Sequence, residues 1–408
     1  MIDETRTHLQ KRPTALDASS DVIRLRRAAW AFTTRRVRAA ACGLASEGRT
    51  PKAGDLLLAR VDSVGYHSAL QLPEGRRRHL FIGDEVVVAY GNRYAPNQFE
   101  AVVPKTLGPC QLVASGGIAG KALSWHTSVS KAATQITPLG LLTDSADMPV
   151  NLRDHALPTI DRVPEPLRPT IAVVGTAMDS GKTQTAAYLV KGLTLAGLRI
   201  GYAKITGTGS GGDMWFLKDA GAHPVLDFTD AGLASTYLES AAEIQRVFVT
   251  LIGHLMNSRV NAIVLEIADG VLQQETAALL ESAVFRKLVG GVLFAASDSM
   301  GASAGHAWLR SRHLPLLALG GVVTTSPLQR RESAKATGLP VFSRQDLARE
   351  RTAISILALA ERQRSAAVRG DPRAGTSPDG NGLAPPDEGP GIPSVVGLAS
   401  AVGRPHQH

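Results

Sequence analysis

The second half of the chain alternates short apolar runs with longer amphipathic segments. The apolar runs have the length and composition of buried strands, and the amphipathic segments repeat their apolar residues at helical spacing. From Thr170 the expected strands are TIAVVGT, RIGYAKI, NAIVLEIADG, GGVLFAAS, PLLALGGVVT and LPVF. The expected helices are KTQTAAYLVKGLTLAG, AAEIQRVFVTLIGHLMNS, ETAALLESAVFRKL and SAGHAWLRSRHL. This alternation predicts an α/β domain over residues 170–365, with a mostly parallel sheet flanked by helices.

The first half has a different pattern, with β-branched runs cut by Gly, Pro and Asn at short spacing. From Gly54 to Pro104 this pattern predicts a small β-barrel or sandwich-like fold, within a smaller β-rich domain over residues 51–150. The segment YGNRYAPNQFEA, residues 90–101, places aromatics and an Arg in a turn-rich loop that either contacts substrate or is structural. The Gly-rich stretch at residues 108–120 is a weak phosphate-binding signal.

The remaining segments are polar or rich in turn residues. Residues 1–50 are polar and then basic, and AAWAFTTRRVRAAACGLASEG within them is expected to form a short amphipathic helix on its own domain rather than a membrane anchor. Residues 151–169 contain four prolines and form a predicted linker. Residues 366–408 are rich in Gly and Pro without periodicity, which predicts disorder.

Composition narrows the class of protein. The formal charge is +8, but the basic residues are scattered and aromatics make up only 5%, so nucleic-acid binding is not expected. No apolar run is long enough to span a membrane, and the N-terminal sequence lacks the apolar centre of a secretory signal. Cys42 and Cys110 make no disulfide framework, and Cys110 is expected to be a buried structural thiol. We therefore expect a cytoplasmic protein.

The stretch VVGTAMDSGKTQTA, residues 173–186, carries the candidate chemistry. It follows an apolar strand, opens a helix and contains Gly-Lys-Thr, which is the context of a phosphate-binding loop. The common pattern has a Gly, four further residues and then Gly-Lys, but Thr176 occupies the position of that first Gly and Gly175 comes one residue earlier. Lys182 is expected to contact the β- and γ-phosphates and Thr183 to bind Mg²⁺.

Three ordered motifs resemble dethiobiotin synthetase and its relatives, including a group of uncharacterised proteins with the same loop. GTAMDSGKT resembles that family's longer loop, YAKITG followed by Asp213 resembles its second strand, and LEIADG resembles its acidic strand end. The likeness covers residues 170–347 and leaves the first domain unexplained. Ile205, Asp269 and Thr324 depart from the family's usual Pro, Gly and Asn, which leaves the acceptor and the nucleotide base open.

The motifs and the resemblance together give a set of candidate site residues. Lys182 and Lys204 are expected to supply catalytic positive charge, because phosphoryl transfer needs cations around the transferred group. Thr183, Asp213 and Glu266 are candidate Mg²⁺ ligands, although Asp213 follows a Gly-rich loop and is otherwise a turn residue. Thr206 and Asp269 are candidate substrate residues. The predicted nucleotide-binding residues are Gly175, Thr176, Asp179, Ser180, Gly181, Lys182, Thr183, Gln184 and Thr324.

These residues lead to one expected function and one rival. The expected function is an ATP-dependent, Mg²⁺-requiring ligase or kinase-like enzyme that transfers phosphoryl to a small carboxylate or carbamate-type acceptor other than the dethiobiotin precursor. The rival is a MobB-like accessory protein that hydrolyses GTP or ATP during cofactor assembly. The expected partners are a nucleoside triphosphate and the small acceptor, and the resemblance implies a homodimer.

Overall fold

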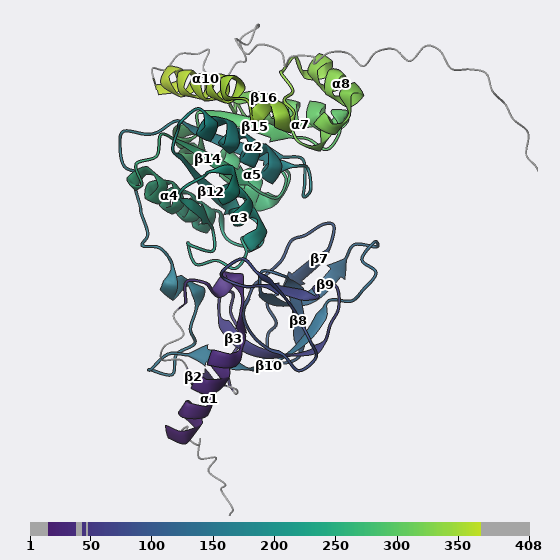
Figure 1. Ribbon diagram of the computed structural model, residues 1–408, viewed down its shortest axis with the longest axis vertical. Coiled ribbons are helices and arrows are strands. Elements are labelled where there is room, and N and C mark those ends of the chain that lie inside the picture. The colour runs from purple at the N-terminus through teal and green to yellow at the C-terminus, as the bar shows by residue number, and fades with distance from the viewer. Residues whose placement is uncertain (1–14, 38–42, 46–47, 369–408) are drawn as a thin grey trace, which may run out of the picture.

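The computed structural model describes residues 15–37, 43–45 and 48–368, which form two stacked parts (Figure 1). The first is a β-barrel with its flanking segments, and the second is an α/β part that runs from Thr170 to Val368. Within the described ranges, no helix is long and apolar enough to cross a membrane.

The barrel closes through five strands of one sheet. Strand β3 pairs with β6 and β10, β10 continues through β8 to β9, and β9 pairs back onto β6. Successive residues of β3 point to opposite faces, so that Leu57 and Ala59 enter one apolar cluster while Leu56 and Leu58 enter another. The first part of the described chain is thus rich in strands, and its extent as a domain over residues 51–150 stays a prediction. The strands are β1 (Ala29–Trp30), β2 (Gly43–Ala45), β3 (Leu56–Ser63), β4 (Ala69–Gln71), β5 (Arg77–His79), β6 (Glu85–Tyr90), β7 (Phe99–Val102), β8 (Cys110–Ala114), β9 (Ile118–Trp125) and β10 (Thr134–Thr143).

The predicted helix within residues 28–48 is wrong. Helix α1 (Ala15–Arg27) ends before this segment, Ala29–Trp30 pairs in parallel with β6, and Phe32–Thr34 form a single 3₁₀ turn. Pairing with the barrel and burial of Phe32 override the weak helical pattern. Residues 38–42 and 46–47 lie outside the described part of the chain.

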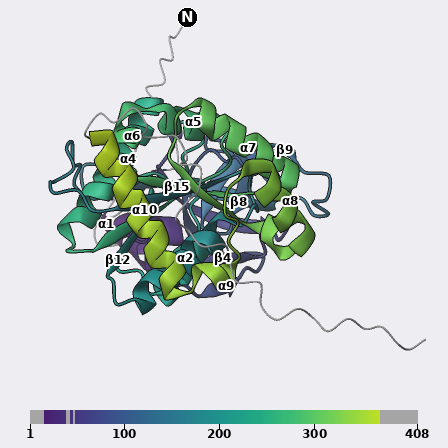
Figure 2. The same cartoon turned by 90° about the horizontal axis from the view of Figure 1, so that it is seen from above.

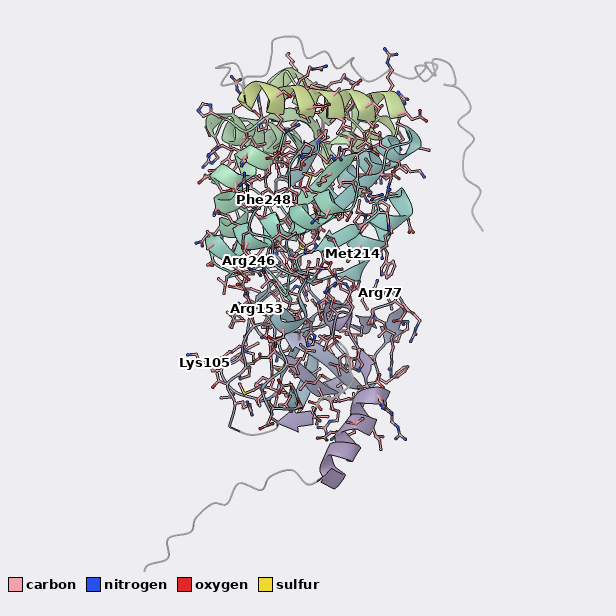
Figure 3. All side chains as sticks on the ribbon, turned by 90° about the vertical axis from the view of Figure 1, so that its left-hand side faces the viewer. Arg77, Lys105, Arg153, Met214, Arg246 and Phe248 are labelled. Atoms are coloured by element: carbon pink, nitrogen blue, oxygen red, sulfur yellow. The ribbon has the colours of Figure 1, made fainter. Side chains whose placement is uncertain are left out.

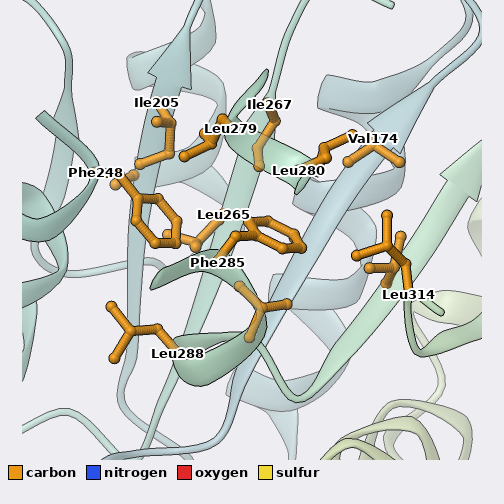
Figure 4. Close-up of a cluster of buried hydrophobic side chains, with 14 of the residues drawn as sticks. Val174, Ile205, Phe248, Leu265, Ile267, Leu279, Leu280, Phe285, Leu288 and Leu314 are labelled. Carbon is orange, nitrogen blue, oxygen red and sulfur yellow. The ribbon is translucent and has the colours of Figure 1, made fainter. Parts of the chain in front are cut away.

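The α/β part contains a six-stranded sheet of order β13-β12-β14-β11-β15-β16, in which all pairings are parallel. Ile171 and Val173 of β11 pack with α2, α3 and α10, whereas Ala172 and Val174 face the opposite cluster with α4 to α7 (Figures 2 and 4). The predicted parallel sheet with helices on both faces is therefore confirmed. The strands are β11 (Thr170–Gly175), β12 (Ile200–Thr206), β13 (Val225–Asp227), β14 (Ala262–Ile267), β15 (Gly291–Ala295) and β16 (Leu316–Gly320). The helices are α2 (Lys182–Leu195), α3 (Gly211–Ala220), α4 (Ala241–Asn257), α5 (Gln274–Glu281), α6 (Ala283–Leu288), α7 (Ser299–Ser311), α8 (Pro327–Thr337), α9 (Arg344–Leu347) and α10 (Glu350–Val368).

Several predicted boundaries shift near the end of this part. Strand β16 stops at Gly320, and Val322–Thr325 form a 3₁₀ turn because Gly321 adopts a φ of 91° that ends the extended run. The predicted LPVF strand reduces to one bridge between Val341 and Leu319. Helix α10 continues to Val368, past the predicted boundary at residue 365. The predicted disorder of residues 366–408 is therefore wrong for residues 366–368, and residues 369–408 lie outside the described residues.

The two parts meet closely. Phe32 from the barrel side lies in the apolar cluster of α2 and α3. A Cβ added at Gly116, in the turn between β8 and β9, would lie 2.0 Å from the carbonyl oxygen of Gly209. Arg35 forms ion pairs with Asp227 at 3.1 Å and with Asp230 at 2.7 Å. The carboxyl ends of the sheet strands therefore face the barrel across a narrow junction.

Candidate functional site

The candidate phosphate loop lies between β11 and α2, as its sequence predicts. Gly181 precedes the helix with a φ of 92°, and Asp179 also has a positive φ of 63°. A Cβ at Gly175 would lie 2.4 Å from the Ser180 hydroxyl, so the early Gly lets the loop fold back on its strand. The Lys182 ammonium donates to the carbonyl of Ala177 at 2.6 Å, across the loop.

Glu266 collects three donors at the end of β14. The residue is 1% exposed, and its carboxylate accepts hydrogen bonds from Thr183 at 3.0 Å and from Tyr202 at 2.8 Å. Lys204 lies 3.5 Å from the same carboxylate and also pairs with Asp213. The ends of β12 and β14 and the starts of α2 and α3 thus form one polar network, in which Tyr202 was not predicted as a site residue.

The network sets the charge of its members. Burial lowers the pKa of Lys182, and the carboxylates of Glu266 and Asp269 partly offset that effect. Burial alone would also lower the pKa of Lys204, but Asp213 and Glu266 outweigh it and raise that pKa. Burial, followed by the charge of Glu266, raises the pKa of Tyr202 well above its ordinary value. Lys204 therefore stays positive and Tyr202 stays a hydrogen-bond donor at neutral pH.

A cavity of about 690 Å³ opens between this network and the barrel. Its size falls in the range of small-molecule sites, roughly 300–1,000 Å³. Figure 3 labels Arg77 of the barrel and Met214 of α3 on opposite sides of the junction. Nine of the predicted site residues line the cavity: Asp179, Gly181, Lys182, Thr183, Gln184, Lys204, Asp213, Glu266 and Asp269.

The other five predicted residues do not line it. Gly175 and Ser180 lie behind the loop, and Thr176 contacts the hydroxyl of Ser297 at 3.1 Å. Thr206 donates to the carbonyl of Ala268, and Thr324 donates to the carbonyl of Gly321 at 2.8 Å. In the expected base-recognition segment it is Val322, not Thr324, that reaches the cavity.

Asp213 is a helical residue and not a turn residue. It lies in the first turn of α3, and the Gly-rich segment before it is hydrogen-bonded on both sides. Gly207 donates to Thr236 at 2.8 Å, and Gly211 donates to Gln71 of the barrel at 2.8 Å. The barrel thus fixes the start of the helix that carries Asp213.

The barrel wall of the cavity contains residues that sequence reasoning did not assign. Arg93 is 4% exposed, and it donates to His67 at 2.9 Å and to Gln98. Asn97 from the same loop donates to Asp179 of the phosphate loop at 2.7 Å. Burial, followed by the charge of Arg93, lowers the pKa of His67 to about 3. The turn-rich segment at residues 90–101 was the available signal, and the structure brings it to the cavity.

Cys110 matches its predicted structural role. It is 1% exposed, and burial raises its pKa to about 12, so it remains a neutral thiol inside the barrel.

The residues present fit a Mg²⁺ ion that arrives with a nucleotide. The Thr183 hydroxyl and the Glu266 carboxylate are adjacent hard oxygen donors, and Mg²⁺ is commonly held by one or two carboxylates together with substrate phosphates. No group of three or more His, Cys, Asp or Glu residues suited to a metal occurs among the described residues, so a dedicated all-protein metal site is not indicated there. Asp213 is engaged with Lys204, and its role as a ligand stays a prediction.

Comparison with known proteins gives only distant likenesses. No protein-family model and no curated protein matches the chain. The signal recognition particle 54 kDa protein from Aeropyrum pernix K1, solved in complex with GDP, shares 18% identity over 51% of this chain and 50% of that chain, with a TM-score of 0.32. The signal recognition particle receptor FtsY from Elizabethkingia anophelis shares 15% identity over 49% and 58%, with a TM-score of 0.27. Chloroplast FtsY from Physcomitrella patens shares 13% identity over 51% and 70%, with a TM-score of 0.33.

The matched region spans half the length of the first of these chains. At these TM-scores the likenesses carry no argument about activity or substrate, and the resemblance to dethiobiotin synthetases stays a prediction.

Proposed function

We propose that this chain binds a nucleoside triphosphate at residues 175–183 and transfers its terminal phosphoryl group to a small carboxylate or carbamate-type acceptor. The observation that carries the proposal is that Lys182 and Lys204, from different elements, line one cavity that the barrel completes. A protein that only hydrolysed nucleotide would not need the barrel as a second side of the cavity. The proposal places the triphosphate against α2 and the acceptor between the triphosphate and the barrel.

The roles of the residues follow from their positions. Backbone N–H groups at the start of α2 bind phosphate oxygens, as helix N-termini do. Lys182 exchanges its bond to Ala177 for the β- and γ-phosphates, and Lys204 offsets charge on the transferred group from the opposite side. Thr183 and Glu266 would hold Mg²⁺, which neutralises phosphate charge when bound.

The proposed reaction balances without a general base. An oxygen of the ionised acceptor attacks the γ-phosphorus, the bond to the β–γ bridging oxygen breaks, and the nucleoside diphosphate leaves with that electron pair. The product is a mixed anhydride of the acceptor and phosphate. Because the acceptor is already ionised, no protein group has to remove a proton from it. The carboxylates of Asp213 and Glu266 therefore need not act as a base, and they orient the Lys204 ammonium.

The alternative is a GTP- or ATP-hydrolysing accessory protein. It is favoured by one observation, namely that Lys204 is already paired with Asp213 and Glu266, which reduces the charge it offers to an acceptor. In that case water would replace the acceptor, and no small acid would accelerate turnover.

The test is diphosphate release from ATP or GTP by the full chain with Mg²⁺ and a panel of small carboxylic acids. We expect at least one acid to stimulate release, and Lys182→Ala to weaken triphosphate binding and abolish release. The matched control is Lys191→Ala, which removes a lysine from the exposed side of α2. Unchanged ATP and GTP affinity in Lys182→Ala would overturn the phosphate-loop assignment, and release that no acid stimulates would favour the accessory protein.

A further inference from the structure

The two walls of the cavity differ in charge. All four carboxylates that line it, Asp179, Asp213, Glu266 and Asp269, belong to the α/β part. The barrel wall contributes Arg77 and Arg93 and no carboxylate among its described residues. Asn97 and Gln71 of the barrel bind the phosphate loop and the start of α3, so this wall faces the proposed transfer site.

Arg93 is the more buried of the two arginines on that wall, since it is 4% exposed and Arg77 is exposed. Its two hydrogen-bonded partners, His67 and Gln98, are uncharged acceptors, and no carboxylate in the described ranges forms an ion pair with it. A guanidinium has five N–H donors, and two are used here, which leaves three. One of the three is on Nε, which is buried and has no partner among the described residues. A buried, unpaired donor of this kind is costly unless something binds it.

We propose that Arg93 is a subsite for a small anion, and that the anion it binds is a carboxylate of the acceptor. This assignment rests on the proposed function, which requires an acceptor as second substrate. Arg93 would be the residue of the barrel wall that binds that acceptor. The unused N–H groups of the planar guanidinium match the two oxygens of a carboxylate. A carboxylate held there faces the lysines across the cavity.

The neighbours of Arg93 orient it and leave its charge unpaired. His67 is fixed from its other side by a 3.1 Å contact between Nδ1 and the Ser115 hydroxyl, so Nε2 is free to accept from Arg93. Burial lowers the pKa of Arg93 to about 10, partly offset by the charge of Asp269. A carboxylate would compensate that burial directly.

The test uses malonate and inorganic phosphate as probes, titrated by calorimetry into the full chain saturated with ADP and Mg²⁺. ADP fills the α- and β-phosphate positions of the loop, and malonate bound at the open γ-phosphate position would not depend on Arg93. We expect malonate to bind, and Arg93→Gln to weaken it by roughly 10- to 100-fold while ADP affinity is unchanged. Arg76→Gln is the matched control, since it removes an exposed arginine next to β5 and should leave malonate affinity unchanged.

A second variant separates the loss of malonate binding from a loss of the fold. Arg93→Lys keeps the charge but has no planar fork, and we expect it to bind malonate more weakly than wild type and more tightly than Arg93→Gln. A purely structural role for Arg93 would lower the melting temperature of both variants and leave malonate affinity intact, which would overturn the proposal. So would phosphate binding in place of malonate, no malonate binding by the wild type, or a parallel loss of ADP affinity.

The inference and the proposed function can fail separately. If Lys182→Ala keeps its nucleotide affinity, the phosphate-loop assignment fails whatever Arg93 does. If Lys182→Ala loses nucleotide but Arg93→Gln binds malonate normally, only the anion subsite fails.

Discussion

Lys204 is the residue at which the site depends most on distant parts of the chain. It lies in β12, two residues before the end of the strand, pairs with Asp213 of α3 and lies 3.5 Å from Glu266 of β14. Because these carboxylates raise its pKa, the ammonium remains charged in a place where burial would otherwise neutralise it. Its charge is therefore fixed before any substrate binds.

Replacing Lys204 should separate binding from transfer. In Lys204→Ala we expect nucleotide affinity within about threefold of wild type, because Lys182 and the backbone of the loop supply that binding. Acceptor-stimulated diphosphate release should fall by roughly 100-fold or more, as it does when a group that stabilises transition-state charge is removed. Nucleotide affinity is measured by calorimetry and release by a coupled assay, with Lys191→Ala as the charge-matched control.

Turnover in Lys204→Ala close to that of Lys191→Ala would contradict a role in transfer. A collapse of nucleotide affinity would instead place Lys204 in the binding of the triphosphate.

The residues of the site were predictable to different degrees. Lys182, Thr183 and Glu266 lie near strand and helix ends that the local pattern predicts, and the structure brings these ends to one cavity, while the roles of the three residues stay predictions. Arg93 comes from the turn-rich segment whose contact with substrate the sequence left open, and nothing in the sequence marked His67. Only folding of the barrel against the sheet brings both residues to the cavity. The predicted roles of Thr206 and Thr324 rest on motif position alone, and their hydroxyls bind backbone carbonyls.

At the scale of elements, close contact between two turns holds the barrel against the sheet. Gly116 lies against Gly209, and both turns line the cavity. Strands and helices of the α/β part were predictable because apolar residues recur in them with the regular spacing of a buried strand or an amphipathic helix. The secondary structure of residues 28–48 was not predictable, because the helical pattern there is short and the pairing of Ala29–Trp30 with β6 is a long-range contact.

Gly116→Ala should destabilise the protein. The added Cβ would meet the Gly209 carbonyl at 2.0 Å, and backbone must move to accommodate it. We expect a loss of about 1–3 kcal/mol in the free energy of unfolding, measured by urea denaturation. Gly108→Ala is the control, since its added Cβ would find its nearest neighbour at 3.7 Å. Equal stability of the two variants would show that the turns yield easily.

At the scale of the whole molecule, one short segment joins the barrel to the α/β part. Ala29 and Trp30 pair within the barrel, Phe32 enters the core beside α2 and α3, and Arg35 reaches the buried carboxylates of Asp227 and Asp230. The sequence indicated two domains but gave no sign of this junction, because its partners lie about 190 residues apart along the chain. The cavity is lined by residues of both parts, so it depends on the contact between them.

Arg35→Met should open the junction in a pH-dependent way. The Arg35 side chain is 13% exposed, and the variant removes the cation that pairs with both buried carboxylates and leaves only Arg36, 3.6 Å from Asp230. The loss costs about 3–5 kcal/mol. Burial raises the pKa of Asp230, and Arg35 opposes that rise, so its loss raises the pKa further. Because the folded state then binds a proton more readily than the unfolded state, stability lost at pH 7.5 should partly return at pH 5.5.

The measurement is urea unfolding of the full chain at both pH values, with Arg24→Met as the comparison. Arg24 also pairs with a carboxylate, that of Glu85, but its side chain is 42% exposed, so its loss should cost about 0–1 kcal/mol with little pH dependence. A deficit in Arg35→Met that is as small as in Arg24→Met, or equal at both pH values, would mean that Arg35 does not hold the two parts together. A large deficit that shrinks on acidification would identify the Arg35 ion pairs as a stabilising contact between the barrel and the α/β part.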